Sequence, residues 1–318
     1  MPPRLCVDAN RISLPPRLWE NEASPIRPLL QLHLLVFIFA ATTILGRLAS
    51  VSAPVLITWR CLIAAVGAFL WVALMRNRRI WLGWREVGKL LGVGAIIGLH
   101  WLCLFGAVKI ANVSIALVGL ATMSLFTAFA EPLFTHRRVQ PFEVFIGMIV
   151  VAGVCLIAGV EKAHELGLFI ALLSALFAAI FLVLNRIIVV GGGDPMVMVG
   201  WEMAASAAVC LAAVPIFDPA GLPALVITDA WDWLWIALLA FVCTVFAQEL
   251  TNRLLRSITA YQMNLVSNFE PVYGIIAAAF IFGDYQTLKP TFYLGALTII
   301  LANFLHPLLE KRFPQTET

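Results

Sequence analysis

The chain has 318 residues, of which 62% are hydrophobic and only 12% are charged, and its mean hydropathy is +0.95. Soluble domains contain roughly 45–50% apolar and about 25% charged residues, so this composition excludes a water-soluble fold. The net charge is +3 and no basic block stands out, which excludes nucleic acid as a partner. Five of the six cysteines lie inside apolar runs, so the sequence indicates neither a disulfide framework nor metal-ligand spacing.

Both ends of the chain are polar. Residues 1–28 carry charged residues among six prolines, without the apolar core or the cleavage site of a signal peptide. This composition predicts a disordered tail over residues 1–28. A second short polar tail is expected over residues 310–318.

Between the tails, apolar stretches of about 20 residues recur along the chain. At about 1.5 Å per residue, a helix of that length crosses a hydrocarbon core of about 30 Å. We therefore expect an all-α membrane protein with ten transmembrane helices. The predicted spans are Leu30 to Leu48, Pro54 to Met75, Lys89 to Val108, Val113 to Phe134, Phe142 to Val160, Leu166 to Ile187, Met196 to Ile216, Trp233 to Leu250, Ala260 to Phe282 and Phe292 to Leu309.

The distribution of lysine and arginine predicts the orientation of these spans. With the N-terminus inside the cell, 16 of the 21 basic residues fall on the cytoplasmic side, 4 fall on the outer side, and Arg60 lies within a span. Cytoplasmic loops of membrane proteins carry an excess of positive charge. Both termini are therefore expected in the cytoplasm, as an even number of spans requires.

Weak internal matches indicate a duplicated architecture. The pair Trp59-Arg60 in the second span corresponds to Trp201-Glu202 in the seventh at an offset of 142 residues. Lys109 corresponds to Arg256 at an offset of 147. These matches are collinear, and transporter folds often arise by duplication of a half.

The matches divide the chain into a first repeat over residues 29–160 and a second over residues 161–309. Each repeat would hold five helices. Because five is odd, the second repeat enters the membrane from the opposite side, so the two halves are expected to be inverted repeats related by an axis in the membrane plane.

Glu270 is the strongest candidate for a functional residue. It lies about ten residues into the ninth span, close to the middle of the bilayer, where a charge costs on the order of 2.5 to 3.5 kcal/mol. A straight helix places Ser267 and Tyr273 on its face, and Asn264 lies on the same span. This polar stripe predicts a cavity lining. The alternative is that Glu270 is protonated or paired and only satisfies the backbone freed by Pro271.

Other candidates join charged and aromatic groups. Arg60 would suit a substrate carboxylate, and the aromatic faces beside it and beside His100 would suit an amphipathic solute. His100 could instead be a neutral imidazole bonded to a neighbouring helix, where Gly94 and Gly98 permit close approach. Tryptophans in spans are also common at the membrane interface. The remaining candidates for substrate binding or coupling are Trp59, Trp101, Trp201 and Glu202.

The inner end of the fourth span carries Glu131, with Thr127 and Ser124 on the same helix face. Glu249 lies at a similar depth. Charges so close to water favour gate or structural roles. The resemblance of Gly83 to Lys89 to a phosphate-binding loop lacks the final Ser or Thr. The sequence contains no catalytic or metal-binding constellation, so we expect no enzyme, no metal and no cofactor.

With these features in view, the chain resembles the EamA family of the drug/metabolite transporter superfamily. The resemblance covers roughly Leu30 to Leu309. Two departures, Ser124 where the family usually has proline and Thr135-His136 in place of Gly-Glu, put a kink and a gate contact in the first half in doubt. The residues that carry the resemblance are Arg60, His100-Trp101, Ala107-Val108-Lys109, Asn268-Phe269-Glu270-Pro271-Val272-Tyr273 and Gly283-Asp284.

The resemblance implies a secondary transporter that exports small organic metabolites such as amino acids by alternating access through a central cavity. Its partners would be a small-molecule substrate and the lipid bilayer, here of a bacterial inner (plasma) membrane. Two alternatives remain open from the residues alone. A solute channel would need rings of charge or a carbonyl filter, and a membrane-embedded enzyme would need a catalytic set clustered at one interface.

Overall fold

A computed structural model describes residues 26–75, 79–136, 138–158, 165–283 and 290–312. Within these ranges every regular element is a helix. The elements are α1 Ile26–Leu48, α2 Ala53–Met75, α3 Trp84–Ile110, α4 Val113–Leu120, α5 Met123–Thr135, α6 Pro141–Ala158, α7 Glu165–Val190, α8 Pro195–Phe217, η3 Leu222–Leu225, α9 Ala230–Ala240, η4 Phe241–Phe246, α10 Ala247–Leu254, α11 Ala260–Ser267, α12 Glu270–Phe282 and α13 Pro290–Arg312.

Each predicted span overlaps helices among the described residues, and the number of ten transmembrane helices stays a prediction. Seven helical segments are long and apolar enough to cross a membrane, and two shorter apolar stretches, Pro141–Gly153 and Tyr293–Ala302, lie in α6 and α13. The ninth predicted span coincides with α11 and α12 together. The chain is therefore an all-helical integral membrane protein. The predicted disordered tails lie almost entirely outside the described residues, and α1 already begins at Ile26.

Two spans are broken at equivalent positions. The fourth span divides into α4 and α5 at residues 121 and 122, and the ninth divides into α11 and α12 at residues 268 and 269. An offset of 147 residues carries both bounds of α4 onto those of α11, and both bounds of α5 onto those of α12. The first half therefore has a helix break although Ser124 stands where the family usually has proline. The kink that this departure put in doubt is present. The hydroxyl of Thr122 donates to the carbonyl of Gly119 at 2.8 Å at this point.

The eighth span contains a further irregularity. Between α9 and α10, the six residues of η4 form a π-helix. A π-helical turn leaves carbonyl groups out of the regular α-helical pattern, and such turns are common at functional sites. This turn lies against α2, the helix that carries Arg60.

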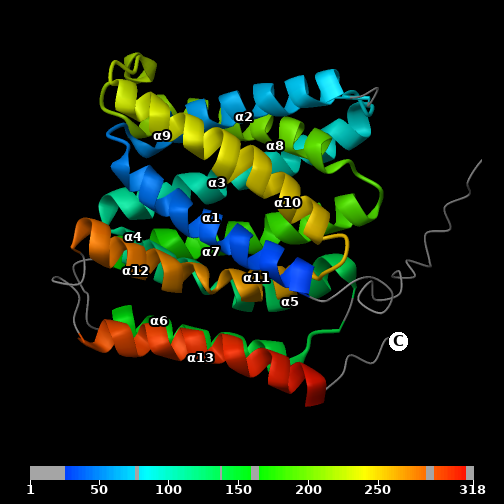
Figure 1. The fold of residues 1–318 in the computed structure, drawn as a ribbon, viewed down its shortest axis with the longest axis vertical. Helices are drawn as coiled ribbons and strands as arrows, with labels where there is room; N and C mark the ends of the chain where they lie inside the picture. The colour runs from blue at the N-terminus through cyan, green and yellow to red at the C-terminus, as the bar shows by residue number, and fades with distance from the viewer. Residues whose placement is uncertain (1–25, 76–78, 137, 159–164, 284–289, 313–318) are drawn as a thin grey trace, which may run out of the picture.

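Helix α3 is packed between α7 and α8, and α2 also packs on α8 (Figure 1). A Cβ atom on Gly94 would fall on the backbone of Glu202, and one on Gly98 would lie 3.1 Å from the Cα of Ser206. The predicted close approach of a second helix at these glycines is confirmed, and the partner is α8. Helices α6 and α13 pack together at one edge of the molecule, at the bottom of Figure 1.

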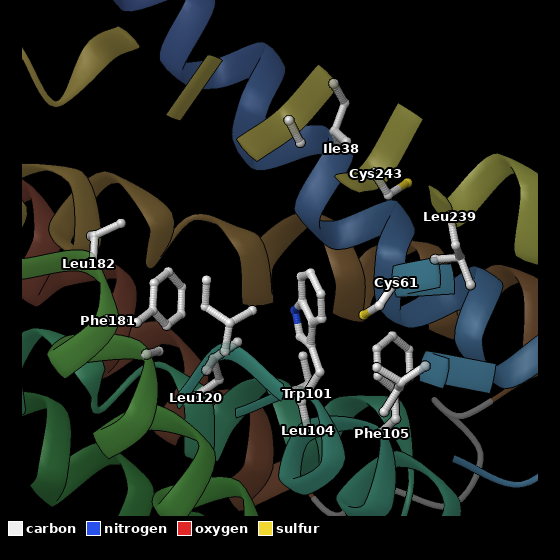
Figure 2. Packing of buried hydrophobic residues seen from close by; sticks show 14 of the residues in the cluster. Ile38, Cys61, Trp101, Leu104, Phe105, Leu120, Phe181, Leu182, Leu239 and Cys243 are labelled. Carbon is white, nitrogen blue, oxygen red and sulfur yellow. The ribbon is translucent and has the colours of Figure 1, made fainter. Parts of the chain in front are cut away.

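The core between the helices is apolar and rich in aromatic residues. Trp101 and Phe105 project from α3 toward Cys61 on α2 and Cys243 in η4 (Figure 2). Phe181 of α7 belongs to the same cluster. This packing surrounds the buried polar groups described below.

Candidate functional site

A small cavity lies among the helices, with a volume of about 70 Å³. Both halves of the chain contribute to its wall. The lining residues lie on α1, α2, α3, α4 and α5 of the first half and on α7, η4, α10, α11 and α12 of the second. Its aromatic lining residues are Phe39, Trp101 and Phe181. Its polar lining residues are Thr42, Arg60, His100, Gln248, Thr251, Asn264, Ser267 and Glu270.

Arg60 is held tightly in the wall of this cavity and is only 1% exposed. Its Nε donates to the hydroxyl of Thr244 at 2.6 Å, and its Nη2 donates to the carbonyl of Cys243 at 3.2 Å. Both acceptors lie in the π-helical turn η4. The guanidinium carbon lies 4.0 Å from the centre of the Trp101 ring, a cation–π contact. The third nitrogen, Nη1, is buried and has no hydrogen-bond partner.

A guanidinium has five N–H donors, and an unsatisfied buried donor is costly. The Thr244, Cys243 and Trp101 contacts fix the plane of the Arg60 group while Nη1 stays unused. Nη1 could therefore donate to a further oxygen ligand, such as a carboxylate, if a neighbouring side chain moved to admit it.

Glu270 begins α12, directly after the break in the ninth span, and is 4% exposed. Its carboxyl group lines the cavity. Among the described residues, no hydrogen bond or ion pair to this carboxyl group is found. The acid therefore borders an open space instead of acyl chains or a closed core.

The break changes the predicted face of the ninth span. Met263, Asn264 and Ser267 of α11 line the cavity with Glu270, but Tyr273 does not. Its hydroxyl instead lies 3.2 Å from Nδ1 of His33 on α1. Tyr273 thus follows the break at residues 268 and 269 and contacts α1, and its assignment to the site stays a prediction.

His100 combines the two roles that the sequence left open. Its Nδ1 lies 3.0 Å from the carbonyl oxygen and 2.9 Å from the hydroxyl of Ser174 on α7. That hydroxyl also lies 3.0 Å from the carbonyl oxygen of His100, to which it donates. The imidazole is thus bonded to a neighbouring helix and also lines the cavity. Trp101 lies beside it and covers Arg60.

Three other candidates lie at the ends of the spans or between helices. The indole nitrogen of Trp59 donates to the carbonyl of Leu225 at 3.0 Å, and that of Trp201 donates to the carbonyl of Ile80 at 3.0 Å. Both rings therefore anchor loops, as interfacial tryptophans do. Glu202 is fully buried between α8 and α7, away from the cavity lining.

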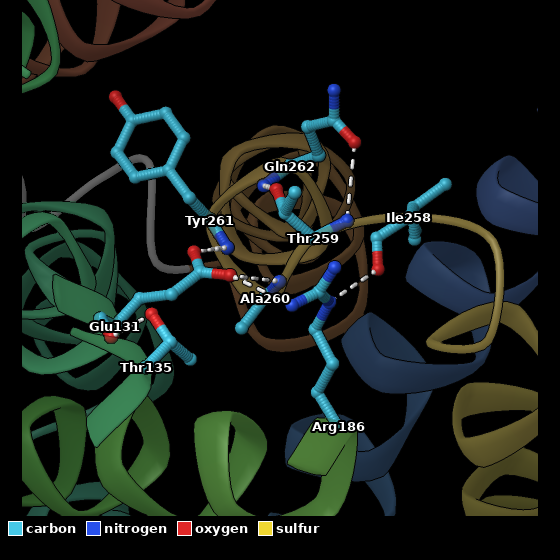
Figure 3. A network of polar contacts seen from close by, with 8 residues as sticks. All are labelled: Glu131, Thr135, Arg186, Ile258, Thr259, Ala260, Tyr261 and Gln262. Carbon is cyan, nitrogen blue, oxygen red and sulfur yellow. Dashed lines mark hydrogen bonds and ion pairs between the residues drawn. The ribbon is translucent and has the colours of Figure 1, made fainter. Parts of the chain in front are cut away.

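A polar network joins α5 to the start of α11 (Figure 3). The carboxylate of Glu131 accepts from the backbone N–H groups of Ala260 at 3.3 Å and Tyr261 at 3.0 Å. Arg186 of α7 lies 3.5 Å from the same carboxylate and donates to the carbonyl of Ile258 at 3.0 Å. Glu131 therefore binds the free N–H groups and the positive end of a helix dipole.

The same helix pair is joined along its length. Asn264 donates to the hydroxyl of Thr127 at 2.5 Å, and Asn268 donates to the hydroxyl of Ser124 at 3.2 Å. Ser124, Thr127 and Glu131 thus lie on one face, as predicted, and that face is the contact with α11. These bonds hold α5 against α11.

Several lining residues were not singled out from the sequence. Thr42, Gln248 and Thr251 are polar residues of apolar or amphipathic stretches, and a threonine in a helix can satisfy its own hydroxyl by bonding a carbonyl one turn back. Thr251 does so with Ala247 at 2.8 Å. Thr244, which orients Arg60, carries no signal in the sequence because its role depends on the π-helical turn.

Comparison with known proteins follows this geometry. The model of the EamA-like transporter family matches the chain twice, over residues 27–159 and 165–306. One crystal structure of another protein has a similar fold, with a TM-score of 0.65 at 16% identity, over 90% of this chain and 97% of the other. At that identity the likeness shows the fold alone. No curated protein matches the chain.

Proposed function

The chain belongs to the EamA-like transporter family, and from this premise we propose that it is a secondary transporter that exports amphipathic amino acids or closely similar metabolites. The family and the all-helical fold make it a membrane transporter of small solutes. The proposal adds the solute class, the direction and the mechanism. The bacterial inner (plasma) membrane is the proposed location, with both termini in the cytoplasm.

The observation that carries the proposal is that two charged side chains lining one cavity still have atoms without a hydrogen-bond partner. Arg60 has a buried Nη1 without a partner, and Glu270 has no partner among the described residues. Phe39, Trp101 and Phe181 supply aromatic surface in the same cavity. A solute with a carboxylate, an ammonium group and an apolar side chain would satisfy both charges and cover the rings. A zwitterionic amino acid has this chemistry.

The mechanism we propose is alternating access. Both broken spans reach the cavity, and Glu270 lies at the first turn of α12, next to the break. In discontinuous helices of transporters, half-helix ends approach the substrate near the middle of the membrane. Movement of α5 and α11 apart would open one side, and Glu270 would change its protonation or its partner as the cavity becomes wet.

The experiment that tests the proposal is uptake into proteoliposomes with phenylalanine as the probe. Two analogues separate the charges, since phenethylamine lacks the carboxylate and phenylpropionate lacks the ammonium group. A hydrogen bond to a charged group is worth about 1.5–3 kcal/mol, so Arg60→Lys and Glu270→Gln are each expected to weaken phenylalanine binding by roughly 10- to 100-fold.

The two analogues show which charged group of the solute each residue binds. Arg60→Lys is expected to leave phenethylamine affinity nearly unchanged, and Glu270→Gln to leave phenylpropionate affinity nearly unchanged. Glu86→Gln serves as a matched control, because Glu86 is exposed and, among the described residues, pairs only with Lys89 at 2.8 Å. If the wild type transports phenylalanine and neither substitution changes that transport, Arg60 and Glu270 have no part in the mechanism. Flux that never saturates would favour a channel, and a chemically altered product would favour an enzyme.

A further inference from the structure

A buried pair of polar side chains lies between α7 and α8, outside the cavity. Glu202 of α8 and Asn185 of α7 are both 0% exposed. The amide nitrogen of Asn185 donates to Oε2 of Glu202 at 3.3 Å. The two remaining oxygens, Oε1 of Glu202 and Oδ1 of Asn185, are buried and have no hydrogen-bond partner.

Both unpartnered atoms are acceptors when the acid is ionised. An ionised carboxylate would leave a negative charge in the low-dielectric interior with one weak donor, and such a charge is costly. A proton on Oε1 would convert it into a donor, and the amide oxygen of Asn185 is an acceptor on the same partner. A carboxylic acid and a carboxamide then form a cyclic pair in which each donates once and accepts once.

We propose that Glu202 and Asn185 form a proton-binding site in which the acid is protonated and paired with the amide. The proton would couple ion movement to transport, an extension that rests on the proposed function. No new chemical step is required, because the proton comes from water and returns to water. This site is separate from Glu270, which lines the cavity.

Most of the charged groups on the neighbouring elements are engaged elsewhere. Helix α8 packs against α2, α3, α10 and η3, and α7 packs against α3, α4, α5, α10 and α11. No titratable residue occurs in η3 or α4. The other titratable groups bonded away from the pair include Arg60 with Thr244, His100 with Ser174, Arg186 with Glu131, Glu249 with Arg253, Lys89 with Glu86 and Cys210 with Gly98. A proton is therefore the simplest means of neutralising Glu202.

Close packing of α3 on α8 surrounds the Glu202 side of the pair. The backbone of Glu202 lies against Gly94 of α3, and Ser206 donates to the carbonyl of Gly94 at 2.6 Å. If α7 separated from α8 during transport, Asn185 would leave Glu202 and water would reach the carboxyl group. Glu202 would then release its proton, and it would bind a proton again as the helices close.

Infrared difference spectroscopy of the purified protein tests the site without any transport assay. A protonated carboxylic acid gives a carbonyl stretching band distinct from that of a carboxylate. At neutral pH we expect such a band in the wild type and in Glu270→Gln, and its loss in Glu202→Gln. The glutamine can keep a neutral amide pair with Asn185, so this variant preserves the packing. Asn185→Ala should keep the band and move it to higher frequency, because the acid loses its partner.

The proposal would be overturned if the carbonyl band of the wild type is unchanged in Glu202→Gln and does not shift in Asn185→Ala. A melting temperature that depends on sodium in the wild type but not in Glu202→Gln would also overturn it, since it would indicate an ionised Glu202 that binds a cation. For the coupling role, transport by Glu202→Gln should lose its dependence on a pH gradient, and retained dependence would remove that role. A wild type that transports none of the probe solutes would count against the proposed function and leave the infrared result standing.

Discussion

At the scale of single residues, the free-energy cost of burying a charge in a membrane identified three residues that line the cavity. Arg60, His100 and Glu270 were selected because charged or polar groups within a membrane need a partner or water, and all three line the cavity. Their individual contacts could not be predicted, because they depend on other spans. The Thr244 contact with Arg60, for example, joins residues 184 positions apart.

Glu131 provides a stability prediction at this scale. Its carboxylate binds two free N–H groups at the start of α11 and pairs with Arg186. Replacing it by glutamine removes the charge from a helix N-terminus, a contribution of about 0.3–2 kcal/mol. We expect Glu131→Gln to lower the melting temperature of the detergent-purified protein, followed by tryptophan fluorescence.

The matched control for this prediction is Glu86→Gln. Glu86 pairs with Lys89 three residues later, and both side chains are at least half exposed. Exposed pairs of this kind contribute little to stability. Equal shifts in the melting temperature for the two variants would contradict the role of Glu131 as the group that binds the start of α11.

At the scale of elements, hydrophobic length located the spans but not their interruptions. The predicted ninth span was continuous, although Pro271 marked a freed carbonyl, and the structure divides it at residues 268 and 269. The fourth span is divided at the equivalent place with no proline nearby. Hydropathy alone could not predict either break, because the residues at both breaks lie within stretches apolar enough to span a membrane.

The contact between α3 and α8 gives a prediction for one element pair. An alanine at position 94 would place its Cβ on the backbone of Glu202 and within 2.8 Å of the Cβ of Ala205. Backbone atoms cannot move aside cheaply, and overpacking of this kind costs about 1–3 kcal/mol. We expect Gly94→Ala to lower the melting temperature.

Gly92 on the same helix is a suitable control, because a Cβ there would meet nothing within 4 Å. Alanine has a higher helix propensity than glycine by up to about 1 kcal/mol, so Gly92→Ala should leave stability unchanged or raise it. If Gly94→Ala were as stable as Gly92→Ala, α3 and α8 would not be in such close contact.

At the scale of the whole molecule, the two halves repeat the same construction. Lys109, at the end of α3, donates to the carbonyl of Ala49 at 2.5 Å, just after α1. Its counterpart Arg256, after α10, donates to the carbonyl of Gly193 at 3.0 Å, just after α7. The sequence offset between Lys109 and Arg256 thus predicted a structural equivalence, even though the side chains differ.

These two contacts also lie at opposite ends of one span. The residues after α1 bind the start of the α9 to α10 span, since the backbone N–H of Ser50 donates to Asp232 at 2.7 Å. Arg256 follows the other end of that span. Equivalent contacts at opposite ends support the proposed inversion of the halves, in which each half closes one side of the membrane.

The contact between α5 and α11 gives a prediction about the transport cycle. Alternating access requires these helices to separate, which would break the bonds from Asn264 to Thr127 and from Asn268 to Ser124. Cysteines at positions 127 and 264, in a background without native cysteines, should be joined by a short reversible bifunctional thiol reagent. We expect the link to abolish phenylalanine transport in proteoliposomes, and a reductant to restore it.

Each single cysteine variant, Thr127→Cys or Asn264→Cys, treated with the same reagent controls for modification of the cavity, because Asn264 lines it. These variants measure the loss of transport that one attached group causes by itself, and the linked protein should lose more transport than either of them. The physical reason is that only a covalent bridge holds α5 against α11 through a complete cycle. Full transport by the linked protein would mean that the solute passes without separation of these helices, and the side closed by Ser124, Thr127 and Glu131 would then not be a gate.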